Sequence, residues 1–305
     1  MSESFDRFAP GTLWHAIVER TGMALSRGAL HPIATETRTI EDHDVRFEVR
    51  VVSSLARKIA EGQGHWPIPA RDGATTNPFQ PYEDDLFVAN ISDTHLCLLN
   101  KYNVIEHHAL VVTRAFEPQE SLLTPADFEA LLSCMAEFDA LGFYNSGPVA
   151  GASQPHKHLQ FVPLPLSTAR PDFPVAALFG SPRHISEPMR LPRLPFAHSF
   201  AWLDPRPFAS VTVQAAYIHT LYRKMLAECG LDALDPRSHP YNWLATRRFM
   251  LLIPRRRERF ENISVNALGF AGSFFVSSQE SLEAISRIGP MEVLKQVTFD
   301  DRGEH

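Results

Sequence analysis

Residues 151–160 read Gly-Ala-Ser-Gln-Pro-His-Lys-His-Leu-Gln, so a run of small residues leads directly into an alternating segment. Because side chains on a β-strand alternate between its two faces, His156, His158 and Gln160 are predicted to share one face. Successive side chains on that face lie about 7 Å apart, with His158 in the centre. The opposite face is predicted to carry Lys157, Leu159 and Phe161. The pattern thus concentrates the chemistry of the segment on one side of a strand.

The ten residues from 145 to 154 read Asn-Ser-Gly-Pro-Val-Ala-Gly-Ala-Ser-Gln and carry little side-chain bulk. Their backbone N–H groups can therefore approach and surround an anion such as phosphate. A neutral histidine is a competent nucleophile toward phosphorus, and we assign that role to His158. Gln160 can donate a hydrogen bond to a phosphate oxygen but cannot act as a general base toward water. These residues predict group transfer at phosphorus rather than hydrolysis.

Two other interpretations of the histidine pair stay open. Imidazoles at positions i and i+2 of a strand also bind Zn, Fe or Mn, usually together with a carboxylate or a third imidazole. Here the third residue on the face is an amide, and the nearest carboxylates, Asp139 and Asp172, are distant along the chain. The other alternative is a purely structural pair, which would leave the preceding small-residue loop unexplained.

The composition is that of a soluble enzyme. The chain has 305 residues, 44% of them hydrophobic, which suffices for a large core in one domain or in two fused halves. A net charge of -6 gives no overall attraction to nucleic acid or to an anionic membrane. The first residues do not resemble a signal peptide, and the apolar stretch 268–276 is too short to span a bilayer. Cys97, Cys134 and Cys229 are scattered and odd in number, so we expect free thiols in a cytoplasmic protein.

Local patterns predict several elements. A helix is expected over residues 11–27, ended by Gly28, and a half-buried strand over 45–51. Residues 62–76 are expected to form a loop, whereas residues 96–99 and 109–113 are expected to form an antiparallel strand pair. A helix is expected to begin at Thr124-Pro125 and to continue with apolar spacing up to Gly142, just before Asn145.

The second half of the chain contains an apparent echo of the first. Residues 109–114 and 250–255 are both apolar strands that end in an arginine. A duplication would leave the second half without histidines, because the later segment reads Ser264-Val-Asn-Ala-Leu-Gly-Phe-Ala-Gly, so one active site per chain is expected. Adjacent His107 and His108 would point in opposite directions on a strand and are not expected to form a site together.

Several segments together resemble one family. Asn145-Ser-Gly-Pro with His156-Lys-His-Leu-Gln is similar to the signature of the diadenosine tetraphosphate (Ap4A) phosphorylases, also called ATP adenylyltransferases. This family is a branch of the histidine-triad superfamily, which also contains galactose-1-phosphate uridylyltransferase. The resemblance covers roughly residues 30–300 and includes further segments in the same order, namely Asn77-Pro-Phe, Glu83-Asp-Asp-Leu, residues 98–113, Tyr241-Asn-Trp-Leu and Asn266-Ala-Leu-Gly-Phe-Ala-Gly.

The resemblance implies an α+β fold of the histidine-triad (HIT-like) type, with a mainly antiparallel sheet, flanking helices and two pseudo-repeated halves. Residues 1–165 would form an N-terminal lobe that carries the catalytic strand. Residues 166–305 would form a C-terminal lobe that completes the nucleotide site, so that the two lobes make one catalytic unit.

The resemblance also implies roles for individual residues. The second histidine of the motif, His158, is the nucleophile, and His156 and Gln160 complete the catalytic set. The family's nucleotide contacts fall on Lys58, Asn100, Lys101, Asn145, Gly151, Ala152, Ser153, Gln154, Gln160, Asn266, Ala267 and Leu268. Two further contact positions differ, because Ser273 and Ser277 stand where fungal members have methionine and lysine. The distal phosphates of the substrate would therefore be held differently. The basic run 255–259 either supplies a cation in place of the missing lysine or is only a solvated face.

The reaction implied is cleavage of Ap4A by phosphate to ATP and ADP through a nucleotidyl-histidine intermediate. The alternatives are a hexose-1-phosphate nucleotidylyltransferase, with a sugar phosphate as acceptor, and a catalytically silent nucleotide sensor. The expected partners are a dinucleoside polyphosphate, ATP, ADP and phosphate, with no nucleic acid and no membrane. We expect no metal site and no tightly bound cofactor, with Mg²⁺ able to accompany the nucleotide substrate.

Overall fold

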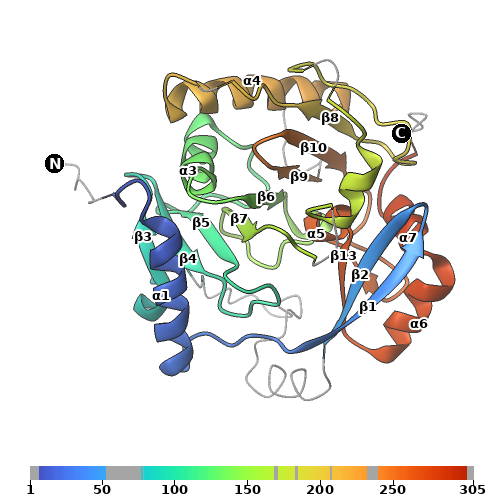
Figure 1. Ribbon diagram of the computed structural model, residues 1–305, viewed down its shortest axis with the longest axis horizontal. Helices are drawn as coiled ribbons and strands as arrows, with labels where there is room; N and C mark the ends of the chain where they lie inside the picture. The colour runs from blue at the N-terminus through green and yellow to red at the C-terminus, as the bar shows by residue number, and fades with distance from the viewer. Residues whose placement is uncertain are drawn as a thin grey trace.

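A computed structural model describes residues 7–52, 77, 79–167, 171–182, 185–206, 208–231 and 240–300. The expected loop 62–76 and the candidate residue Lys58 lie outside these ranges. The main feature is an eight-stranded antiparallel sheet that contains strands from both halves of the sequence (Figure 1). Its strands, in spatial order, are β3 (Phe87–Asn90), β4 (His95–Leu99), β5 (Ala109–Thr113), β7 (His158–Pro163), β6 (Ala140–Asn145), β9 (Tyr241–Ala245), β10 (Phe249–Pro254) and β8 (Ser199–Trp202).

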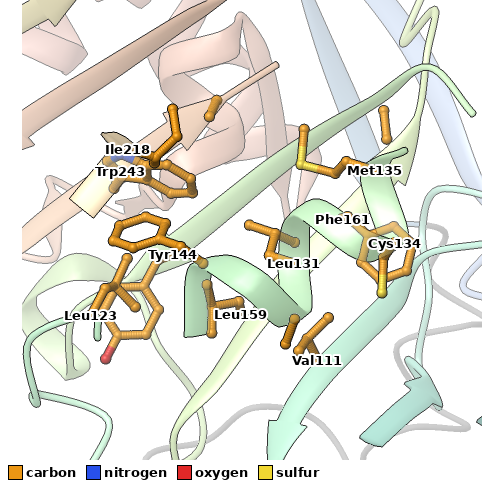
Figure 2. Close-up of a cluster of buried hydrophobic side chains, with 14 of the residues drawn as sticks. Val111, Leu123, Leu131, Cys134, Met135, Tyr144, Leu159, Phe161, Ile218 and Trp243 are labelled. Atoms are coloured by element: carbon orange, nitrogen blue, oxygen red, sulfur yellow. The ribbon is translucent and has the colours of Figure 1, made fainter. Parts of the chain in front are cut away.

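One face of this sheet is covered by three helices, namely α1 (Leu13–Ser26), α3 (Pro125–Met135) and α4 (Val211–Glu228) (Figure 1). Their apolar side chains form one core with every second residue of the strands. Figure 2 shows part of this core, in which Leu131 and Met135 of α3 lie with Val111, Leu159 and Phe161 of the sheet. Apolar packing against these helices therefore occupies one face of the catalytic strand.

The other face of the sheet is covered by a second layer over strands β6, β9, β10 and β8. This layer contains a three-stranded sheet of β1 (Thr35–Asp42), β2 (Val45–Val52) and β13 (Ser273–Val276), in the order β1-β2-β13. It also contains the helices α5 (Ala267–Ala271), α6 (Gln279–Ile288) and α7 (Pro290–Gln296), and a short strand pair, β11 (Arg259–Phe260) with β12 (Ile263–Ser264). Over β3, β4 and β5, the described residues on the same face form a small apolar cluster centred on Leu96, Leu98, Leu110 and Val112. The catalytic strand lies where the thick covering layer ends.

Most of the local predictions are confirmed. Helix α1 and strands β2, β4 and β5 lie within two residues of their expected bounds, and β4 and β5 pair antiparallel.

In the described part of the chain, every helix is too short or too polar to span a membrane.

The prediction for the helix after Thr124 is correct at its start and wrong at its end. The Thr124 side chain accepts from the backbone N–H of Asp127, whose carboxylate accepts from Thr124 N–H, so the helix begins with a capping box. The helix ends at Met135 instead of Gly142, because residues 140–145 pair with β7 and β9 as strand β6. Gly142 is part of that strand, and a Cβ there would lie 2.7 Å from Met135 Sδ, so glycine permits the close approach of α3.

The strand order indicates a different match between the two halves of the chain from the one predicted from the sequence. About the central β6–β9 pair, β5-β7-β6 on one side is matched by β8-β10-β9 on the other. Strand β10, which contains residues 250–254, thus occupies the position of β7 rather than that of β5. The predicted match of residues 109–114 with 250–255 is not the one this topology favours, and the duplication itself stays a prediction.

Candidate active site

The predicted alternation along the catalytic strand is confirmed. Leu159 and Phe161 point into the core beneath α3, and the fully buried Lys157 Nζ reaches Asp127 Oδ2 of that helix at 2.6 Å. On the opposite side the rings of His156 and His158 both contact Phe79, with ring centroids 5.5 and 5.4 Å away. The two histidines therefore share a face, as the sequence predicted.

His158 is the first residue of β7 and is 4% exposed. Its Nδ1–H donates to the carbonyl oxygen of His156 at 2.8 Å, so Nε2 carries the lone pair, and no described residue donates to it. Burial lowers the pKa of His158 to about 4, so the imidazole is neutral at physiological pH. A neutral ring with a fixed tautomer meets the requirements for a nitrogen nucleophile.

His156 contributes its main chain to this arrangement. Its ring Nε2 lies 2.8 Å from the carbonyl oxygen of Thr113, and its Nδ1 lies 2.9 Å from the side-chain amide of Asn77. Both ring nitrogens are thus engaged with the protein, whereas the His156 carbonyl sets the tautomer of His158. Asn77 and Phe79 both lie in the Asn77-Pro-Phe segment, so the structure brings this segment to the motif.

A chain of donors orients the amide of Gln160. The backbone N–H of Tyr102 donates to Asn100 Oδ1, Asn100 Nδ2 lies 3.1 Å from His108 Nδ1, and His108 Nε2 lies 2.9 Å from Gln160 Oε1. Burial lowers the pKa of His108 to about 4, so this ring is neutral and donates through Nε2. The oxygen of Gln160 is therefore occupied, and no described residue accepts from its NH₂ group.

A second chain of donors orients the Asn145 side chain, again with the amide oxygen accepting. Arg255 Nη1 donates to Asn242 Oδ1 at 2.5 Å, and Asn242 Nδ2 donates to Asn145 Oδ1 at 2.7 Å. The backbone N–H of Ala267 also donates to Asn145 Oδ1, at 2.9 Å. Asn145 pairs with Asn242 across β6 and β9, and no described residue accepts from its NH₂ group. Two amide donors are thus near His158, namely Gln160 two residues along the same strand and Asn145 on the neighbouring strand β6.

The small-residue loop folds back onto the segment that begins α5. Gly147 and Gly151 have φ values of 80° and 89°, and a Cβ on Gly151 would lie 2.9 Å from the carbonyl oxygen of Val265 and from Asn266 Cβ. Glycine therefore permits this contact. It joins two predicted binding segments that are distant in sequence, namely Gly151, Ala152, Ser153 and Gln154 with Asn266, Ala267 and Leu268.

The remaining candidates lie around this centre. Lys101 follows Asn100 and pairs with Glu83 at 2.5 Å. Ser273 lines a cavity of about 50 Å³ together with Ser264, Asn266 and Phe275, and its buried hydroxyl has no hydrogen-bond partner among the described residues. Ser277 is half-buried and follows the opposite end of β13, where Val276 pairs with Val51.

Arg255 fits neither interpretation of the basic run. Its side chain is 1% exposed, so it is not part of a solvated face. Its guanidinium donates to Asn242 Oδ1 and to the carbonyl oxygens of Ala150, Val265, Val297, Arg257 and Glu258. Every N–H group is thereby used, so Arg255 is not available to substitute for the missing lysine. Arg255 instead supports the small-residue loop from within the protein, through its contact with the Ala150 carbonyl oxygen.

Metal binding by the histidine pair receives no support in the described part of the chain. There, no group of three or more His, Cys, Asp and Glu side chains is arranged to hold a metal ion. The third residue on the catalytic face, Gln160, is bound to His108, as described above.

Sequence reasoning did not single out Phe79, His108, Asn242 or Gln119, whose side chain accepts from the His158 N–H, and it treated Arg255 only as part of the basic run. Phe79 and Asn242 lie in segments that the family resemblance contains, so the resemblance could have included them. His108 and Gln119 are 52 and 39 residues from their partners on β7. No local pattern indicates contacts over such distances.

Two family models match consecutive parts of the chain. The Ap4A phosphorylase N-terminal domain matches residues 3–181, and the ATP adenylyltransferase C-terminal domain matches residues 192–300. Among curated proteins of Saccharomyces cerevisiae, diadenosine 5',5'''-P1,P4-tetraphosphate phosphorylase 2 is 28% identical over 292 residues, covering 86% of each chain. The protein APA1 of the same yeast is 25% identical over 301 residues, covering 91% of this chain and 90% of APA1.

The structures agree with this result. The crystal structure of yeast Ap4A phosphorylase Apa2 in complex with AMP is 24% identical, with a TM-score of 0.77 over 97% of this chain and 99% of Apa2. The complex of Apa2 with Ap4A gives a TM-score of 0.75 at 22% identity over the same shares. The likeness shows that the chain has the HIT-like fold of Apa2, as expected. Since the two family models together match nearly the whole sequence, this chain belongs to the family of Ap4A phosphorylases, or ATP adenylyltransferases.

Proposed function

We propose that this protein cleaves Ap4A with inorganic phosphate to give ATP and ADP, through a nucleotide bound covalently to His158. The observation that carries the proposal is the environment of this ring. Its Nδ1–H is held by the His156 carbonyl at 2.8 Å, and the amides of Asn145 and Gln160 are oriented as donors beside it. Two groups that can stabilise charge on a phosphoryl oxygen thus accompany the unprotonated nitrogen.

In the first step, His158 Nε2 attacks the α-phosphorus of one adenylyl group. A P–N bond forms and the bond from that phosphorus to the bridging oxygen breaks, so ATP leaves and AMP remains on the ring. In the second step, an oxygen of inorganic phosphate attacks the same phosphorus, the P–N bond breaks, and ADP leaves. Two displacements of similar geometry thus replace one difficult step.

We infer that the family's substrate contacts apply to this chain. The backbone donors of residues 151–154, here called the phosphate loop, would bind the phosphates near His158, together with Asn145 and residues 266–268. Asn100, Lys101 and Lys58 would be further contacts. In support, the loop meets α5 at Gly151, and the buried Arg255 remains cationic because burial lowers its pKa only to about 9. A positive charge beneath the loop favours an anionic ligand above it. Ser273, with its unpartnered hydroxyl, would contact the distal phosphates.

We infer a cytoplasmic location. The observation in support is that Cys97, Cys134 and Cys229 are buried free thiols, which fit a reducing compartment.

The direct test is a product assay with Ap4A in the presence and absence of phosphate. We expect ATP and ADP in equal amounts, with turnover that depends on phosphate. Faster turnover with a hexose 1-phosphate as acceptor would identify a sugar nucleotidylyltransferase instead. Tight binding of Ap4A without turnover would identify a nucleotide sensor.

Replacing Gln160 with histidine is expected to raise the share of hydrolysis, measured as AMP formed from Ap4A at saturating phosphate. A histidine can take a proton from water in the second step, whereas the glutamine amide cannot titrate. Chromatography of the products gives the AMP share directly, and Gln214→His on α4 is a control on the far side of the molecule. An unchanged product ratio would show that water is excluded by other means.

Replacing Ser277 with lysine is expected to lower KM for Ap4A more than KM for a dinucleotide with a shorter phosphate chain. A charged donor beside the distal phosphates contributes about 1.5 to 3 kcal/mol, which corresponds to roughly a 10-fold to 100-fold lower KM. The control Ser286→Lys places a lysine on α6 away from the proposed site. Equal changes of KM for both substrates would place Ser277 outside the polyphosphate site.

A further inference from the structure

The pairing between β6 and β7 stops two residues before Asn145 and His158. The last paired residues are Phe143 and Gln160, and in the same register Asn145 would lie opposite His158. Each of these two residues still pairs with its other neighbour, Asn145 with Asn242 on β9 and His158 with Val112 on β5. Between β6 and β7 the ladder is therefore interrupted from Tyr144 and Leu159 onward, so Asn145 and His158 are not paired with each other.

The side chain of Gln119 fills this opening. Its Oε1 accepts from the backbone N–H of His158 at 2.8 Å. Its Nε2 donates to the carbonyl oxygens of Asn145 at 2.8 Å and of His158 at 3.2 Å. The amide thus makes the hydrogen bonds that the two strands would otherwise make to each other.

Gln119 is held rigidly in this position. The residue is completely buried, its backbone N–H donates to the Pro155 carbonyl at 2.8 Å, and its carbonyl oxygen accepts from the Tyr144 hydroxyl. Both the main chain and the amide are therefore fixed, and Pro155 and Tyr144 lie next to the two strands that the amide joins.

We propose that Gln119 is a positioning residue that sets the separation between Asn145 and His158, and thereby forms the space in which the reacting phosphoryl group is held. Strands joined directly lie about 4.8 Å apart, and an amide inserted between them holds them further apart. Asn145 and His158 project from the same face, so the inserted amide also separates the donor from the nucleophile. This role deepens the proposed nucleotidyl transfer and rests on it.

The substitution Gln119→Glu tests the hydrogen-bond pattern with almost no change in shape. A carboxylate at this position still accepts from the His158 N–H but faces the Asn145 and His158 carbonyl oxygens without a donor. Only the protonated acid restores the donor, and burial favours that form. The variant should therefore be inactive at high pH and recover as the pH falls. His158, whose pKa is about 4, keeps its neutral form down to nearly that pH.

Other titratable groups lie around this position. They are His156 and His158 on the β7 side, Tyr144 on β6, and Glu117 and Glu120 beside Gln119 in sequence. All of them are present in the wild type and in the variant, so the ratio of the two pH profiles isolates the introduced carboxyl group.

The experiment measures kcat and KM for phosphate-dependent Ap4A cleavage between pH 5.5 and 8.5, with Tm at each pH. The variants are Gln119→Glu, the apolar Gln119→Met, and Gln214→Glu as a control on α4. At pH 8.5 we expect kcat of Gln119→Glu to be roughly 100-fold below that of the wild type, since a displacement of about 1 Å costs that much. Recovery of about 10-fold or more is expected at pH 5.5, whereas Gln119→Met should stay low at every pH.

The outcomes are separable. An inactive wild type would overturn the proposed function, whereas an active wild type with a parallel pH profile for Gln119→Glu would overturn the positioning role alone. Lower Tm values with unchanged kcat would show that Gln119 only stabilises the fold. If neither Gln119 variant yields folded protein, the residue is a folding determinant and the positioning role is rejected.

Discussion

Replacing His158 with alanine is expected to lower kcat for Ap4A cleavage by roughly 10⁴-fold to 10⁶-fold, the range found when a catalytic residue is removed from an enzyme that forms a covalent intermediate. The reason is that no other described group can take its place. The ring nitrogens of His156 are bound to Thr113 and Asn77, and His108 is bound to Asn100 and Gln160. KM should change little, because the phosphate loop and Asn145 are retained.

The covalent intermediate gives a second measurement of the same step. Wild-type protein mixed with Ap4A in the absence of phosphate should carry AMP, and peptide mapping should locate it on His158. Steady-state rates should follow ping-pong kinetics, because ATP leaves before phosphate reacts. The exposed His15 on α1 provides the control variant, His15→Ala, which should behave as wild type. AMP found on His156, or turnover by His158→Ala near the wild-type rate, would contradict the assignment.

The sequence predicts the catalytic strand well because one physical rule governs it. Alternation between two faces places His158 and Gln160 together, and the structure adds the apolar packing of Leu159 and Phe161 that requires this register. A slip of one residue would bury both polar groups and expose the core side chains. The face of each side chain was therefore predictable from six residues.

The sequence predicts the end of α3 poorly because two rules compete there. Apolar residues continue at helical spacing to Leu141, yet residues 140–145 are fully buried between two strands. A central strand is apolar on both faces, so its pattern does not differ from that of a buried helix. Tertiary pairing with β7 and β9 decides the outcome, and neither partner is local.

The orienting groups of the site were not predictable at all. A glutamine at position 119 or an arginine at position 255 has an ordinary sequence context, and each acquires its role only when distant strands meet. The same holds for His108, whose neutral state results from burial. Sequence analysis therefore proposed the residues that would react, and the structure identified the residues that hold them in place.

Replacing Lys157 with methionine is expected to lower the free energy of unfolding by about 3 to 5 kcal/mol, the cost of leaving a buried charge without its partner. Lys157 is completely buried, and its Nζ lies 2.6 Å from Asp127 Oδ2, 3.1 Å from Glu117 Oε2 and 3.0 Å from the Leu122 carbonyl. Without the ammonium, the 1%-exposed Asp127 still contacts His95 Nε2 at 3.0 Å but loses its buried cationic partner. Urea unfolding monitored by circular dichroism measures the change.

The double variant Lys157→Met with Asp127→Asn is the matched control. It removes the buried charge on both sides, so it should recover at least half of the loss, because an apolar or neutral pair avoids the desolvation cost. A single variant within about 1 kcal/mol of the wild type would show that the ion pair is not a major source of stability.

The dependence of the free energy of unfolding on pH at acidic pH tests the Lys157–Asp127 pair without a substitution. Burial alone would raise the pKa of Asp127, but hydrogen bonds from His95 and Lys157 lower it to about 2, below the value near 3.8 in the unfolded chain. A depressed pKa contributes stability that is fully present above the unfolded value and is lost as the pH falls toward the folded value. Wild-type stability should therefore decline between about pH 4 and pH 2. The decline should be shallower in Lys157→Met, because one of the two interactions that lower the pKa is gone. Equal slopes would mean that other carboxylates govern acid unfolding.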